Sequence, residues 1–239
     1  QENNDELGYT NFMMDMLNEG TKKYSSLQFD EALDSLGSNL GFGSGLDTSY
    51  ATVSTLKTNL SQTLDLAKEA LIHPTFPQNE IDRIKKQTLA SIIQEENRPA
   101  AIAYRNIGKL LYGENHPYGK PLTGSGISKT ISNITRNDVI AVHNRAINPA
   151  NLTFAVAGDI ELDVLVEILE DKFGNWSGNS NSNLKELNNV TLPDSRRVYL
   201  IDKPNAQQSY IVAGQLLPPS ATDEEIKISY MNYAIGGSF

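Results

Sequence analysis

The sequence predicts a globular α+β fold. Apolar residues at helical spacing recur along the 239 residues, and short β-rich segments lie between the helical ones. Hydrophobic residues make up 39% of the chain and charged residues 21%, which is typical of a protein with one or two packed cores. A folded protein with mixed secondary structure is therefore expected.

The composition narrows the function classes. The net charge of −9 argues against nucleic-acid binding, which needs clustered Lys and Arg. No run approaches the roughly 18 apolar residues of a membrane span. The chain has no Cys, which removes disulfides, thiolate catalysis and Cys-based zinc sites. The absence of Cys is compatible with an exported bacterial protein. A location in the periplasm or cell envelope of a bacterium is weakly favoured over the cytoplasm.

Elements in the first half follow from periodicity and caps. Polar residues 1–6 are expected to be frayed, and a helix then runs to about Asn18. Ser49 to Leu56 alternates and predicts a strand. Further helices are predicted at 26–36, at 61–72 with Ser61 as its N-cap, at 77–96 and at 101–112.

The second half is predicted in the same way. Thr135 and Asp138 form a capping-box variant that opens a helix to about Ala146. Residues 174–189 are rich in Ser, Asn and Gly and predict a linker. The remaining predicted elements are a buried strand at 151–158, a helix at 162–173, strands at 197–202 and 208–215, and a helix at 223–235.

A Gly-rich stretch at 37–45 superficially resembles a phosphate-binding loop. No Lys-Ser/Thr pair follows it, and no helix opens after it. A turn followed by a strand edge is preferred.

The three histidines give no metal motif. His73, His116 and His143 have no other His and no Glu partner at ligand spacing, and two of them precede Pro. Structural roles are expected for all three.

The first helix carries the most informative pattern. Its expected buried stripe consists of Tyr9, Phe12, Met13, Met16 and Leu17. Asn11, Met14 and Asp15 lie at i, i+3 and i+4 and are expected on the opposite side. An inverted zincin places two His and a catalytic Glu on such a face. Zinc needs three protein ligands and a water that a base activates. An Asn amide is a poor zinc ligand, and Met cannot act as the base.

This segment resembles the zinc-binding helix of the pitrilysin/insulinase family, G-x-x-H-F-x-E-H-M-x-x-x-G-T. The frame is kept at Gly8, Phe12, Met16, Gly20 and Thr21. The H-x-x-E-H positions hold Asn11, Met14 and Asp15. The family's third ligand, a Glu on a later helix, corresponds to Ser91. The resemblance thus implies four vacated positions, no catalytic or metal-binding residue, and no zinc or other cofactor in this chain.

The resemblance extends over nearly the whole chain in the family's order. Its segments are Gly8–Thr21, Ser49–Asn59, His73–Phe76 with the helix after it, Leu110–Thr123, Thr135–Asp159 and Tyr199–Gly214. It implies a two-layer α+β fold in which helices pack on an antiparallel-containing sheet. A first subdomain at 1–190 that lacks its initial strands and a truncated second one at 191–239 are expected. Exposed strand edges and self-association are then expected.

The family resemblance also implies a role and partners. Family members pair a zinc-bearing half with an inactive half that closes over it. This chain is expected to be the inactive half, to pair with a zinc-bearing domain or subunit, and to contact peptide or unfolded polypeptide. Three alternatives stay open: a structural or assembly subunit without a role in proteolysis, an active peptidase with altered ligands that include Asp15, and an unrelated α+β binding domain.

Overall fold

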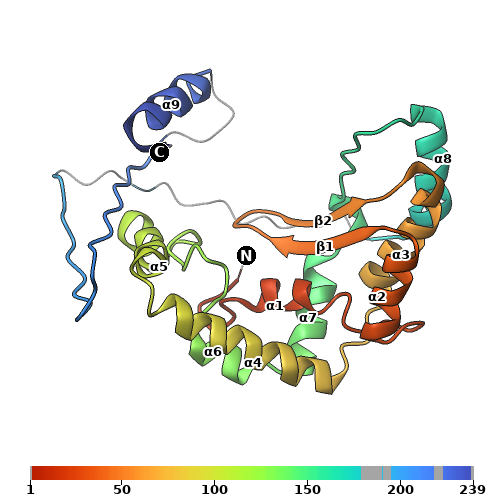
Figure 1. Cartoon of the computed structure of the whole chain (residues 1–239), viewed down its shortest axis with the longest axis horizontal. Helices are drawn as coiled ribbons and strands as arrows, with labels where there is room; N and C mark the ends of the chain where they lie inside the picture. Colours follow the sequence, from red (N-terminus) through yellow and green to blue (C-terminus); the bar gives the residue numbers. More distant parts are fainter. Residues whose placement is uncertain (1, 179–189, 191–194, 218–222, 238–239) are drawn as a thin grey trace.

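A β-hairpin lies across the middle of the molecule, with helices on one side of it and at its ends (Figure 1). The computed structural model describes residues 2–178, 190, 195–217 and 223–237. The α+β class is confirmed, and the sheet that the described residues form has two strands. The predicted linker at 174–189 lies mostly outside them, as does the predicted subdomain boundary near 190.

Helices dominate the described chain. They are α1 (Tyr9–Asp15), α2 (Ser26–Ser35), α3 (Leu60–Ile72), α4 (Gln78–Glu95), α5 (Pro99–Tyr112), α6 (Ser128–Asn133), α7 (Arg136–Ala146), α8 (Leu162–Phe173) and α9 (Glu225–Asn232). A π-helical turn, Tyr233–Gly237, continues α9, and short 3-10 turns lie at Lys57–Asn59 and Pro149–Asn151. No helix among the described residues is long and apolar enough to cross a membrane.

The sheet is an antiparallel hairpin of β1 (Asn39–Ser44) and β2 (Ser49–Ser54). Its register runs from Asn39 opposite Ser54 to Ser44 opposite Ser49. Helix α1 packs on β1, and within the described residues no further strand pairs with β2. One long edge of the hairpin therefore offers unpaired backbone groups.

The core forms where α1 packs between the hairpin, α4 and α7. The predicted stripe is confirmed: Phe12, Met13, Met16 and Leu17 are at most 1% exposed. Burying each such side chain contributes about 1.5–3 kcal/mol. The helix is shorter than predicted, because the Met16 N–H turns back to the Met13 and Met14 carbonyls and ends it at Asp15.

The helix caps test several predictions. The Thr135–Asp138 capping box is present and opens α7. Ser61 is wrong as an N-cap, since a 3-10 turn precedes α3 and leads directly into its first residue, Leu60. The predicted break between the helices at 77–96 and 101–112 is present, but α5 begins at Pro99, two residues earlier than predicted.

Three predicted strands are wrong. Residues 151–158 form no strand and are exposed rather than buried, with Phe154 at 44%. Residues 197–202 and 208–215 are likewise exposed without a ladder. The alternating sequence fits a strand, yet a strand exists only when a neighbouring strand accepts its backbone hydrogen bonds. Nothing among the described residues supplies that neighbour.

Candidate functional site

Helix α1 is held at its start by close backbone packing. Gly8 is its N-cap, with φ of +91°, and a Cβ there would lie 2.7 Å from the Gly126 Cα. The Glu2 carboxylate accepts hydrogen bonds from the N–H groups of Gly8 and Thr10, at 2.8 and 2.6 Å. An anion at a helix N-terminus satisfies free donors and favours the helix dipole. The expected fraying of residues 1–6 is therefore wrong for Glu2.

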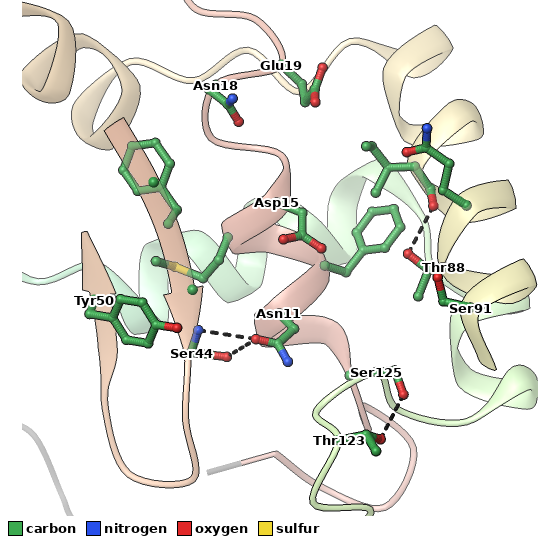
Figure 2. A pocket seen from close by; sticks show the side chains of 18 of the residues that line it. Asn11, Asp15, Asn18, Glu19, Ser44, Tyr50, Thr88, Ser91, Thr123 and Ser125 are labelled. Carbon is green, nitrogen blue, oxygen red and sulfur yellow. Dashed lines mark hydrogen bonds between the residues drawn. The ribbon is translucent and has the colours of Figure 1, made fainter. Parts of the chain in front are cut away.

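One face of α1 opens into a cavity of about 700 Å³ (Figure 2). The hairpin forms one wall, α4 forms the opposite wall, and the loop after α5 forms the lower rim. The lining residues that carry polar side chains are Asn11, Asp15, Asn18, Glu19, Ser44, Tyr50, Gln87, Thr88, Ser91, Thr123 and Ser125. We call this cavity the α1 pocket. Asn11, Met14, Asp15 and Ser91 all line it, although Ser91 is far from the others in sequence.

Asn11 connects α1 to the hairpin. Its side-chain oxygen accepts hydrogen bonds from the Ser44 N–H at 3.2 Å and the Ser44 hydroxyl at 2.5 Å. These bonds fix the end of β1 against the helix and use the lone pairs that a metal would need. Asn11 is therefore a structural link in this conformation.

Met14 departs from the predicted arrangement. It was expected on the polar side of α1, opposite the apolar stripe, but only 1% of its surface is exposed and it belongs to the main core. Its buried side chain forms part of the lining of the α1 pocket. The sheet that packs on α1 buries this side of the helix, which a single helix's periodicity does not reveal.

Asp15 presents its carboxylate to the α1 pocket (Figure 2). The side chain reaches solvent through the pocket mouth, while surrounding protein removes part of its hydration. That partial burial, with the nearby Glu19 charge as a smaller cause, raises the pKa of Asp15 to about 6. Glu19 itself pairs with Arg83 and accepts a hydrogen bond from the Ser26 hydroxyl at 2.7 Å.

Ser91 and Thr88 lie on the α4 wall. The Thr88 hydroxyl donates to the Ile84 carbonyl at 2.9 Å, which leaves its oxygen lone pairs free toward the pocket. Ser91 is solvent-exposed and its hydroxyl makes no hydrogen bond within the described chain. This wall offers neutral hydroxyl groups and no carboxylate.

Arg105 on α5 fixes the lower rim, and sequence reasoning missed it. Its side chain is 9% exposed, and its guanidinium donates hydrogen bonds to Glu95 at 2.6 Å, to Ser125 at 2.9 Å and to the Gly126 carbonyl at 2.8 Å. The Ser125 hydroxyl also donates to Glu95 at 2.7 Å. The network ties α4 and α5 to the rim loop. Two of its partners, Ser125 and Gly126, lie in irregular backbone, and Glu95 lies on another helix, so no periodicity in the sequence pointed to the network.

The donor set of the α1 pocket does not fit zinc. Asn11 is engaged by Ser44, Met14 is in the core, and Ser91 offers a neutral hydroxyl. Only Asp15 and Glu19 supply carboxylates, whereas a zinc site needs three ligands and a base. Across the described ranges, no three His, Cys, Asp or Glu side chains gather as a metal site.

The described histidine contacts are structural. The His116 Nδ1 accepts a hydrogen bond from the Tyr118 N–H at 3.1 Å, and its ring stacks on Tyr112. The His143 Nε2 lies 2.8 Å from the Leu71 carbonyl oxygen. None of the three histidines lines the α1 pocket.

Family comparisons cover almost the whole chain. The model for insulinase, peptidase family M16, matches residues 1–125, which is more than half of the chain. This chain belongs to the insulinase family. The model described as the peptidase M16 inactive domain matches residues 133–239 of this insulinase-family chain. The family resemblance inferred from the vacated helix motif is confirmed.

Most of the bacterial relatives compared with this insulinase-family chain are named uncharacterized zinc proteases, and one is named a non-peptidase homolog. An uncharacterized zinc protease of Rickettsia felis is 25% identical over 76% of this chain and 43% of its own length. One of Mycobacterium leprae is 20% identical over 96% of this chain and 51% of its own length. A Helicobacter pylori relative named a non-peptidase homolog is 24% identical over 70% of this chain. The chain spans about half the length of the curated relatives it matches.

Solved structures agree with the family assignment. The peptidase M16 inactive domain from Pseudomonas fluorescens superposes with a TM-score of 0.70 and 26% identity, covering 78% of this chain and 44% of that one. A Helicobacter pylori protease gives a TM-score of 0.69 at 19% identity, covering 79% of this chain and 44% of the protease, which supports the fold alone.

Proposed function

We propose that this chain is the non-catalytic half of a bacterial zinc endopeptidase. Its role is to close a peptide-binding chamber together with a zinc-bearing domain or subunit of the same family. The observation that carries the proposal is the convergence of Asn11, Met14, Asp15 and Ser91 on the α1 pocket. Where the family resemblance expects ligands and a base, the residues offer one unpaired carboxylate.

The described residues suggest how such a wall holds a peptide. Strand β2 has no second strand neighbour in the described part of the chain, and all six of its residues are exposed. An extended peptide can pair with such an edge through main-chain hydrogen bonds. We propose that peptide or unfolded polypeptide substrate aligns on this edge, and that cleavage belongs to the partner that carries zinc.

Metal analysis and peptidase assays test this role. The purified chain is expected to hold less than stoichiometric zinc and to leave fluorogenic peptides intact. Addition of a zinc-bearing family member from the same organism is expected to form a complex and to increase cleavage. One tightly held zinc per chain, lost in Asp15→Ala, would overturn the proposal. Peptide cleavage by the chain alone that a chelator blocks would instead support an active peptidase with altered ligands.

A structural or assembly subunit is the second candidate, and the non-peptidase name of the Helicobacter pylori relative favours it. Affinity capture separates the two. Recovery of a zinc-bearing homologue, with peptide binding seen in the complex, supports the chamber. Capture of a stable complex whose cleavage rate does not depend on this chain supports the assembly role.

A further inference from the structure

The α1 pocket has an unbalanced charge. The Asp15 carboxylate makes no hydrogen bond or ion pair with any described residue, and Glu19 is already engaged by Arg83 and Ser26. No Lys, Arg or His of the described chain lines the pocket. A ligand that supplies a positive charge would therefore meet a carboxylate without a competing partner.

The neutral groups around Asp15 are suited to the same ligand. Asn18 and Ser91 have side-chain oxygens that accept no hydrogen bond within the described residues, and Thr88 keeps free lone pairs. A Lys ammonium or an Arg guanidinium carries only donors, so it needs several acceptors around one negative charge. The pocket supplies that arrangement.

The position of the hairpin connects the pocket to a polypeptide. Tyr50 belongs to β2 and also lines the α1 pocket. A strand added along the free edge of β2 would lie on the side of β2 away from β1, and alternate side chains of that strand would face the side of the sheet that carries the Tyr50 side chain. A long side chain from the added strand could then enter the pocket.

We propose that the α1 pocket binds the basic side chain, lysine or arginine, of a polypeptide aligned on this chain. This inference rests on the proposed function, because it names the side chain that the chamber wall selects. An anionic ligand is disfavoured, since none of the described lining residues is a cation. A metal ion is disfavoured because only one unpartnered carboxylate is available there.

Binding of paired peptides to the purified chain tests the inference. The probes are short fluorescein-labelled peptides of Ser, Val and Thr with a central lysine. The matched neutral probe carries Nε-acetyllysine at that position, and fluorescence anisotropy measures the dissociation constant of each. The lysine peptide is expected to bind about tenfold more tightly, an advantage that falls as salt is raised. Asp15→Asn is expected to remove the advantage, and Glu31→Gln, which removes an exposed charge outside the lining, is expected to keep it.

A second variant guards against a folding defect in Asp15→Asn. Ser91→Lys, at an exposed position on the opposite wall, brings an internal ammonium into the pocket and is expected to remove the same advantage. Equal binding of both peptides to the unaltered chain overturns the inference alone. An advantage that persists in both variants places the site elsewhere and also overturns it. Binding of neither peptide overturns the inference and the peptide-holding role together.

Discussion

The Asn11 side-chain oxygen accepts two hydrogen bonds from Ser44, one from its N–H and one from its hydroxyl. The pair joins helix α1 to the end of strand β1. It occupies the position where the family resemblance expects a zinc-binding His. Asn11 thus helps to hold the hairpin in place.

Asn11→Ala is expected to lower the free energy of unfolding by about 1–2 kcal/mol, because two hydrogen bonds at a partly buried position are lost. Ser44→Ala should cost less, since its N–H still reaches Asn11. Denaturant melts of both single variants and the double variant measure the coupling. Additive losses would show that the link does not stabilise the hairpin.

Met14→Glu, which restores the acidic residue of the motif, is expected to destabilise the chain by more than about 3 kcal/mol. Met14 is 1% exposed, so the variant buries a carboxylate among apolar side chains. Met14→Leu is the volume-matched control and should cost less than about 1.5 kcal/mol. Thermal melts followed by circular dichroism compare the two, and similar melting temperatures would place residue 14 at the surface.

Arg105→Lys is expected to cost about 2–3 kcal/mol, because an ammonium cannot reproduce the planar set of donors to Glu95, Ser125 and Gly126. The rim loop should also exchange its amide hydrogens faster. Lys86→Gln, at an exposed position on α4, serves as the control. Unchanged exchange in the rim loop of Arg105→Lys would contradict the assigned role.

The raised pKa of Asp15 predicts a pH dependence of stability. Its folded pKa of about 6 lies above the ordinary value of 3.8, so the folded state binds more protons between these pH values. This group therefore makes stability fall as pH rises from about 4 to 6, with Glu19 as the neighbouring charge that contributes. Asp15→Asn is expected to stabilise the chain at pH 7 by about 1 kcal/mol, a value reduced for solvent access. Melts at several pH values test this, and a variant less stable at pH 7 would refute it.

Exposed apolar side chains predict self-association of the isolated chain. Val198 and Leu200 are 96% and 95% exposed, and the β2 edge is free among the described residues. Replacing both side chains by Lys is expected to reduce association without lowering the melting temperature. Light scattering over a concentration series measures it. A stable monomer with a cooperative melt in the unaltered chain would count against this expectation.

Local chemistry determined much of the fold from the sequence alone. The α1 stripe, the capping box at Thr135 and the break between α4 and α5 depend on neighbours within a few residues, so periodicity and cap chemistry were enough. The family motif also indicated that Ser91 belongs with Asn11, Met14 and Asp15, a grouping that distance along the chain does not suggest.

Only the tertiary structure decided what depends on distant neighbours. A helix seen alone places Met14 opposite the apolar stripe, but packing on the hairpin puts it in the core. Residues 151–158 alternate like a strand, yet without a partner ladder they form none. The Arg105 network and the raised pKa of Asp15 likewise arise from groups brought together by folding. Sequence fixes local conformational preference, whereas burial and pairing are properties of the assembled chain.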